Sequence, residues 1–331
     1  MITIAFFNNK GGVGKTSLVY HLSWMFADLG KKLIAVDLDP QANLTSMFLE
    51  EGRLEELWPD GKHLLTIDGV IEPIRRGLGD IQDPHVEKIS ENLGLVVGDL
   101  ALSGFEDRLS AAWLNCQSGD EAAFRTMTAF YRAIHKASDS SDAMLALIDV
   151  GPNLGAINRA ALIASDYVVM PLASDLFSLQ GLRNLGPQLQ SWRRTWKELE
   201  GKNPAPDLLL PSGKMQPVGY VVMQHAIRAD RPVKAYQRWM DKIPIEYRKS
   251  VLDDCLPENV AIESDHYCLA RLKHYRSLMP LAMEAHKPIF FLKPADGAIG
   301  AHVAAVQESY DHFSDLARKI ADLVGIPLRD G

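Results

Sequence analysis

Residues 6–18 read FFNNKGGVGKTSL, and this stretch decides the fold. A glycine-rich turn that ends in Gly-Lys-Thr at 14–16, between an apolar run and a helical pattern, is typical of a phosphate-binding loop. Such a loop directs backbone N–H groups at one point, where the dipole of the following helix adds positive potential. The loop has one departure, because Asn9 stands where the usual pattern has a glycine, and Lys10 follows it. The stretch therefore predicts a P-loop that binds a nucleoside triphosphate.

Each position of the loop has an expected task. The glycines let the backbone approach an anion closely. The Lys15 ammonium is expected to reach the β- and γ-phosphates of ATP, and the Thr16 hydroxyl to bind Mg²⁺. A dinucleotide-binding fingerprint does not fit, because Ser17 occupies the place of its third glycine. The candidate nucleotide-binding residues are Gly11, Gly12, Val13, Gly14, Lys15, Thr16 and Ser17, with Met223 and Gln224, at the end of a later strand, as adenine contacts.

Three aspartates stand at the ends of predicted buried strands. Asp37 and Asp39 follow the strand predicted at 33–36, and Asp149 lies at the end of the strand predicted at 144–150. The carboxyl ends of parallel strands form the edge where such sheets bind ligands. Phosphoryl transfer needs one carboxylate to hold the magnesium shell and one to orient water. The magnesium candidates are therefore Thr16, Asp37, Asp39 and Asp149.

The hydrophobic pattern predicts one α/β domain over residues 1–331, with a doubly wound, mostly parallel sheet and helices on both faces. Predicted strands are 2–7, 33–36, 93–97, 144–150, 167–171 and 218–223. Predicted helices are 18–29, closed by Gly30, and 66–76, 101–114, 120–136, 156–164, 178–200 and 298–324. We also expect a turn at 137–142, a Pro-rich loop at 201–213, and a basic, mostly helical region at 230–275.

The composition is that of a soluble globular protein, with 47% apolar and 23% charged residues. The net charge of −7 gives no global support for nucleic-acid binding, although a local basic face remains open. Three widely separated cysteines predict reduced thiols. The chain has no signal-peptide pattern at its start and no run near the ~20 apolar residues that cross a bilayer. We therefore expect a cytoplasmic protein with no membrane partner.

Three motifs together resemble the ParA/MinD family of deviant Walker-A ATPases, and most closely the ParA and Soj partition ATPases. They are KGGVGKTS at 10–17, VDLDPQAN at 36–43 and IDVGPNLG at 148–155. The later stretches 158–171, 177–182 and 279–288 also resemble family elements. Residues of about 50–140 and 200–275 match poorly, and we interpret them as insertions into a single P-loop ATPase domain.

The resemblance implies further roles. Lys10 matches the signature lysine, which crosses a nucleotide-sandwich dimer to the partner's phosphates, so Lys10 joins the nucleotide-binding residues. Asp39 matches the carboxylate that positions or activates the attacking water, and Asp149 matches one that bonds magnesium through water. Asp37 is expected to support the phosphate and magnesium end. The catalytic candidates are thus Lys10, Lys15 and Asp39. Gly151 replaces a proline that is usual in the family, which predicts a looser switch.

The resemblance also implies a slow, magnesium-dependent ATPase that forms an ATP-dependent homodimer and is stimulated by a ParB-like or other protein. Its output is expected to be partition or positioning of DNA or another large cargo, with non-specific DNA binding by the dimer and association with the nucleoid. Candidate phosphate contacts are Arg193, Arg194, Lys197, Arg228, Arg231, Lys234, Arg238, Lys242, Arg248, Lys249, Arg271, Lys273 and Arg276. The competing interpretation is a solvated helix face whose cationic side chains cover Trp192 and Trp196.

Other outputs stay open. An ATP-switched regulator of another protein complex, without DNA binding, would use the unmatched regions as docking surfaces. A MinD-like membrane switch needs an amphipathic basic tail, which residues 317–331 do not provide. A metal-cluster carrier needs paired cysteines near the switch loops, and Cys116, Cys255 and Cys268 match no such motif. Because the first predicted strand starts at residue 2, we expect no helix-turn-helix extension and no operator-specific binding.

Overall fold

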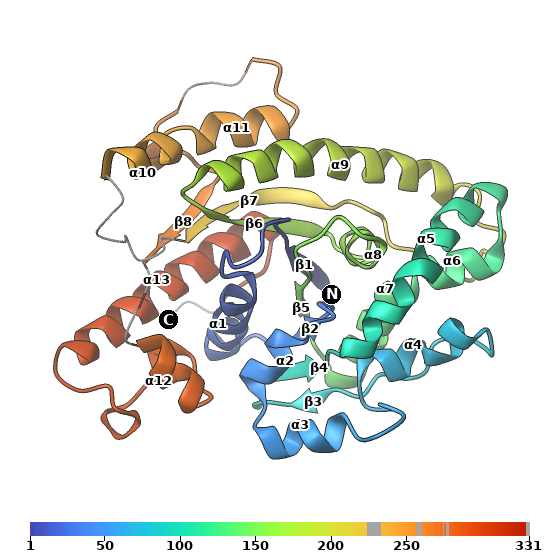
Figure 1. Ribbon diagram of the computed structural model, residues 1–331, viewed down its shortest axis with the longest axis horizontal. Coiled ribbons are helices and arrows are strands. Elements are labelled where there is room, and N and C mark those ends of the chain that lie inside the picture. The colour runs from blue at the N-terminus through green and yellow to red at the C-terminus, as the bar shows by residue number, and fades with distance from the viewer. Residues whose placement is uncertain (224–232, 257–259, 274, 276–277, 329–331) are drawn as a thin grey trace.

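An eight-stranded sheet forms the centre of the structure (Figure 1). The computed structural model describes residues 1–223, 233–256, 260–273, 275 and 278–328. The strand order is β3-β4-β2-β5-β1-β6-β7-β8, and every pairing is parallel except that of β3 with β4. The strands are β1 (Ile2–Phe6), β2 (Leu33–Asp37), β3 (Glu87–Lys88), β4 (Leu93–Val96), β5 (Leu145–Asp149), β6 (Tyr167–Ala173), β7 (Gln216–Met223) and β8 (Cys268–Leu272).

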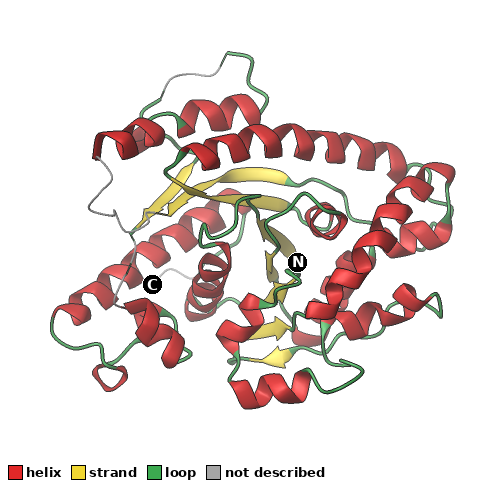
Figure 2. Ribbon diagram, viewed as in Figure 1, coloured by secondary structure: helices red, strands yellow, loops and turns green. Residues whose placement is uncertain are grey.

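Helices cover both faces of this sheet (Figure 2). The α-helices are α1 (Lys15–Asp28), α2 (Asn43–Phe48), α3 (Glu51–Leu57), α4 (Ile67–Arg76), α5 (Glu106–Asn115), α6 (Glu121–Met127), α7 (Ala129–Ser141), α8 (Ala156–Ile163), α9 (Leu176–Glu200), α10 (Val233–Met240), α11 (Ile243–Ser250), α12 (Leu278–Glu284) and α13 (Ala301–Val324). Short 3-10 turns are η1 (Leu100–Phe105), η2 (Cys116–Ser118), η3 (Ile262–Ser264), η4 (Ile289–Phe291) and η5 (Pro294–Asp296). The predicted doubly wound α/β fold is confirmed.

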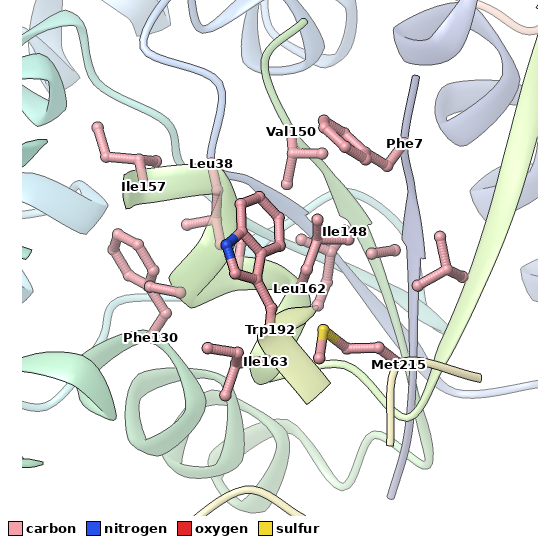
Figure 3. Close-up of a cluster of buried hydrophobic side chains, with 14 of the residues drawn as sticks. Phe7, Leu38, Phe130, Ile148, Val150, Ile157, Leu162, Ile163, Trp192 and Met215 are labelled. Carbon is pink, nitrogen blue, oxygen red and sulfur yellow. The ribbon is translucent and has the colours of Figure 1, made fainter. Parts of the chain in front are cut away.

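The two faces of the sheet carry two separate hydrophobic cores. Alternate residues of β1 divide between them: Ala5 belongs to the core formed with α4 to α9, and Ile4 to the core formed with α1 and α13. Figure 3 shows part of the first core, where Trp192 of α9 lies among side chains of the sheet and of α8. Burial on both faces explains why the strands read as continuous apolar runs.

The strand register brings the sequence motifs to one edge. β5 lies between β1 and β2, and Asp149 pairs with both Phe6 and Asp37 across the sheet. The P-loop begins directly after Phe6, so the loop and the two aspartates meet although they are far apart in the chain. The predicted ligand edge therefore exists as one place in the fold.

The predicted turn at 137–142 is wrong, because α7 continues to Ser141. The hydroxyls of Ser140 and Ser141 donate to the carbonyl of Ala137 over 3.0 and 2.7 Å, so they serve the helix instead of opening a turn. Asp142, at φ +52°, then ends the helix.

The prediction that 230–275 is mostly helical is wrong in its second half. α10 and α11 are helical as expected, but β8 adds an eighth strand in parallel with β7. Its sequence, CLARL, has no β-branched residue, so the strand depends on pairing with β7 and not on local preference. No helix within the described ranges combines the length and the apolar character needed to cross a membrane.

Candidate nucleotide-binding site

The P-loop joins β1 to α1 and leaves the start of that helix open. Gly14 is the N-cap residue of α1 at φ +86°, and no side chain caps the helix there. A Cβ at this position would also lie 3.1 Å from Cε of Met223, so both conformation and space call for glycine. The free N–H groups at the helix start, with no acidic residue in its first turn, are suited to bind an anion.

Two cavities meet the loop. The larger, of about 570 Å³, is lined by most of the predicted nucleotide-binding residues together with Asp39, and it extends to α2 and α12. The smaller, of about 270 Å³, contains Val13 and Met223, and its wall also includes Tyr275 and Met279. The predicted residues in the larger cavity are Gly11, Gly12, Gly14, Lys15, Thr16, Ser17 and Asp39. Gln224 lies outside the described residues.

Asp37 accepts hydrogen bonds from the segment that follows β2. It is fully buried, and Thr45 donates to its Oδ2 through both the backbone N–H (2.9 Å) and the hydroxyl (2.8 Å). The N–H of Asp39 donates to Oδ1 over 3.2 Å. Burial raises the pKa of Asp37 to about 7. These contacts fix the segment that carries Asp39, while the predicted support of magnesium by Asp37 stays a prediction.

Asp149 is a fully buried carboxylate whose two oxygens are both free to accept hydrogen bonds. Within the described part of the chain, neither of its oxygens has a hydrogen-bond partner. Burial, and then the charge of Asp37, raise its pKa, while Thr16 and Lys15 lower it. A buried carboxylate without partners is costly, so the residues fit a cation or an ordered water at this point.

Among the described residues, Asp149 is not part of a cluster of protein ligands that could bind a metal ion without a nucleotide. The described residues contain no group of three or more His, Cys, Asp or Glu side chains able to hold a metal ion. Mg²⁺ commonly takes only one or two protein ligands and completes its shell with water and substrate phosphates. Thr16 and Asp149 therefore fit magnesium brought in with a nucleotide better than a resident metal site.

Asp39 lies against the loop that follows β5. Its Oδ1 accepts the N–H of Gln41 over 3.0 Å, and a Cβ on Gly151 would lie only 3.3 Å from the same oxygen. The carbonyl of Gly151 in turn accepts a hydrogen bond from Nδ2 of Asn158 over 2.8 Å. Glycine at 151 thus permits close approach of Asp39 to a loop that Asn158 contacts, and the looser switch expected there stays a prediction.

Lys10 does not line either cavity, and its side chain turns to its own α9. Its ammonium forms an ion pair with Asp175 and lies 5.8 Å from the ring centre of Phe177. Asp175 is also the N-cap of α9, because its Oδ1 accepts the N–H of Ser178 over 2.8 Å. Sequence reasoning missed Asp175, although an aspartate just before a helical pattern is an N-cap signal.

Part of the predicted basic surface is structural, and its prediction is wrong for Arg248. This side chain is buried and pairs with Asp265 over 2.7 Å, while the hydroxyl of Tyr220 donates to the same carboxylate over 2.6 Å. Arg193 is half-buried and donates to the carbonyl of Met215 over 2.7 Å. Trp192 and Trp196 belong to the first core and not to a surface.

The other predicted cations divide into paired, exposed and undescribed groups. Arg271 pairs with Glu263, and Lys273 with Glu308. Arg238 and Lys242 are exposed and flank Trp239, with their charged groups 5.5 and 5.2 Å from its ring centre. Arg194 and Lys249 are exposed as well, and so are three paired cations: Arg271, Lys273, and Lys197, which pairs with Glu200 over 2.7 Å. Arg228, Arg231, Arg276 and the side chain of Lys234 lie outside the described part of the chain.

Comparison with known proteins yields related sequences. The family model described as "AAA domain" matches residues 1–200. The sporulation initiation inhibitor protein Soj of Bacillus subtilis (strain 168) is 30% identical over 183 residues, which cover 55% of this chain and 62% of Soj. The virulence plasmid ParA family protein pGP5-D of Chlamydia psittaci is 31% identical over 186 residues, covering 56% of this chain and 62% of that protein. The chain therefore spans less than two thirds of the length of these two relatives.

A solved structure extends the likeness over the whole chain. McdA of Cyanothece, determined as a variant in complex with ATP, superposes with a TM-score of 0.63 over 100% of this chain and 99% of McdA. The two sequences are 14% identical, so this likeness concerns the fold.

Proposed function

Because the chain belongs to the ParA/MinD-type P-loop ATPases, we propose that it binds ATP at residues 10–17 and hydrolyses it slowly as a sandwich dimer. One observation carries this proposal. The uncapped start of α1, the ammonium of Lys15, the hydroxyl of Thr16 and the carboxylate of Asp39 all line one cavity at the carboxyl edge of the sheet. Anion binding, charge neutralisation and water positioning are the components that phosphoryl transfer requires.

The residues divide the chemical work. The N–H groups of α1 and the side chain of Lys15 bind the β- and γ-phosphates, and Asp39 orients the attacking water. Magnesium, when bound with ATP, neutralises phosphate charge, and Thr16 directly and Asp149 through water are the residues that would hold it. The buried, unpartnered carboxylate of Asp149 supports this assignment. Asp37 would contribute only weakly to the magnesium shell, because its oxygens already accept three hydrogen bonds.

The smaller cavity is the proposed adenine site. Met223, Tyr275 and Met279 line this cavity, which does not include Asp39, and their apolar surfaces suit a flat purine ring. Substituting Met223 with Asp should weaken ATP and ADP binding alike, because both nucleotides carry the base. If the variant bound ATP and ADP as tightly as the wild-type protein does, this placement of the adenine site would be rejected.

Lys10 is proposed to act in a second copy of the chain. Its side chain is about a quarter exposed and is held by Asp175, away from its own cavity, so it is available to a partner only after that ion pair opens. A lysine supplied in trans would stabilise the phosphate charge of the other subunit, as an arginine finger does. Hydrolysis then depends on dimerisation, and a ParB-like or other protein that favours the dimer would stimulate it.

The proposed output is positioning of DNA or another large cargo, with the exposed cations of α10 and α11 binding DNA phosphates. The ATP-trapped Asp39→Ala protein should bind duplex DNA without sequence preference in an anisotropy titration at several salt concentrations. Lys242→Ala should weaken binding and lower the log–log salt slope by about 1, whereas Lys136→Ala, an exposed lysine on α7, should not. No binding at low salt would instead favour the alternative, an ATP-switched regulator of another protein complex.

Hydrolysis itself is tested by measuring phosphate release from ATP with and without Mg²⁺. Wild-type protein should show slow turnover that Lys15→Ala and Asp39→Ala abolish. Asp39→Ala should still bind ATP, since Asp39 contributes to water positioning and not to the phosphate cradle. Turnover by Asp39→Ala at the wild-type rate would contradict the proposed role of this carboxylate.

A further inference from the structure

The helix that follows Asp149 is capped from outside its own segment. α8 begins at Ala156, and its N-cap residue, Gly155, has no side chain to accept a hydrogen bond. Glu106, the first residue of α5, takes that place: its Oε1 accepts the N–H of Ala156 over 2.5 Å, and its Oε2 accepts the N–H of Ile157 over 2.9 Å. A carboxylate from a distant part of the chain thus fixes the start of α8.

The approach of this carboxylate is close. A Cβ on Gly155 would lie 2.6 Å from Oε1 of Glu106, so any other residue at 155 would require this carboxylate to shift. A second contact reinforces it, because the guanidinium of Arg159 in α8 lies 4.6 Å from the ring centre of Trp113 in α5. The two helices therefore meet through both a charged cap and an aromatic contact.

The start of α8 connects to the catalytic carboxylate in two further steps. Asn158, in the first turn of α8, donates to the carbonyls of Gly151 and Asn153 over 2.8 and 2.7 Å. Gly151 is the residue whose backbone lies against Asp39. A displacement of the first turn of α8 would therefore move the backbone that lies next to Oδ1 of Asp39.

We propose that Glu106 is a positioning residue for hydrolysis, which sets the placement of Asp39 through Asn158 and Gly151. The inference rests on the proposed ATPase function. It also gives a task to the region of about 50–140, which carries Glu106 and lacks detailed resemblance to the family. α5 is then the element through which that region acts on turnover.

Steady-state ATPase measurements on the full chain test this proposal. Glu106→Gln keeps the shape but loses the charge and one acceptor, and Glu106→Ala removes the cap. Because small misplacements of catalytic groups are costly, kcat of Glu106→Ala should fall roughly ten- to a hundredfold, with Glu106→Gln in between. KM for ATP and affinity for ADP should stay within about twofold, since the P-loop is untouched.

Asp107→Asn is the matched control. It makes the same kind of change one residue along α5, where the side chain is exposed, and should leave kcat at the wild-type value. A kcat within about twofold of wild type for both Glu106 variants would overturn the proposal. Parallel loss of kcat and ADP affinity would overturn it too, because that pattern indicates general damage to the fold.

Hydrogen exchange separates this inference from the proposed function. Glu106→Gln should speed amide exchange at 151–158 and leave α1 unchanged, whether or not the protein hydrolyses ATP. Unchanged exchange at 151–158 would reject the role of Glu106 alone. Faster exchange combined with no ATPase activity in the wild-type protein would instead reject the proposed function and leave the cap in place.

Discussion

His21 should make the protein lose stability in mild acid. It lies in α1 with 1% of its surface exposed and stacks on Phe313 at a ring distance of 4.9 Å. Its Nδ1–H donates to the carbonyl of Ser17 over 2.6 Å, and its Nε2 accepts the N–H of Ile289 over 3.2 Å. Both nitrogens are therefore used by the neutral ring, and a second proton would break the bond to Ile289 and leave a charge in an apolar core.

The magnitude follows from the pKa values. Burial lowers the pKa of His21 from 6.5 to about 4, with the bond to Ser17 opposing the change. The folded pKa is depressed, so this contribution to stability is intact above pH 6.5 and is lost as the pH falls toward 4. The difference in pKa corresponds to about 3 kcal/mol at the acid limit and to about 2 kcal/mol at pH 5.

Urea unfolding at pH 7.5 and pH 5 measures the effect. Wild-type protein should lose about 2 kcal/mol more between these conditions than His21→Gln, whose side chain does not titrate. His266→Gln, at an exposed position, should keep the wild-type pH dependence. If wild type and His21→Gln lost the same free energy of unfolding, a depressed pKa of His21 in the folded state would be contradicted. His21 would then bind no more protons in the unfolded chain than in the folded chain.

Three further predictions concern contacts near the site and below the basic surface. Asp175→Asn should release Lys10 and increase ATP-dependent self-association in light scattering, and unchanged association would show that the ion pair does not restrain the lysine. Arg248→Ala should lower the unfolding free energy by about 3–5 kcal/mol, because the buried carboxylate of Asp265 loses its cation, whereas an effect under 1 kcal/mol would contradict the assigned structural role. Gly151→Ala should reduce kcat about tenfold with unchanged ADP affinity, since the new Cβ would displace Asp39, and wild-type kcat would reject that contact.

Local patterns in the sequence were sufficient to predict the main elements of the candidate site. The P-loop, the strand ends at Asp37 and Asp149, and the long helix α9 all depend on residues within one short window, and the parallel topology brings them to one edge. The strand β8 was missed because its stability comes from pairing with β7 and not from its own composition. The helical end of α7 was missed because serine can serve either a turn or a helix carbonyl.

Pairs that are distant in the chain could not be predicted from composition or spacing. Glu106 and Ala156 are 50 residues apart, and Lys10 and Asp175 are 165 residues apart, so only the fold reveals each contact. Arg248 looked like a surface cation because its neighbours are basic, whereas Asp265 and Tyr220 take it into the interior. Sequence pattern thus identified which residues could act, and the structure decided which of them are already engaged.

The central claim is that ATP is held between two copies of the chain, with Lys10 acting across the interface. The most direct measurement is the molar mass of the protein by light scattering. It compares Asp39→Ala with Asp39→Ala/Lys10→Ala, each in ATP with Mg²⁺ and in ADP with Mg²⁺. We predict a dimer in ATP that Lys10→Ala converts to monomer, and loss of turnover when Lys10→Ala is made alone. A Lys10→Ala protein that dimerises in ATP and hydrolyses it like the wild type would contradict a role of Lys10 across the interface.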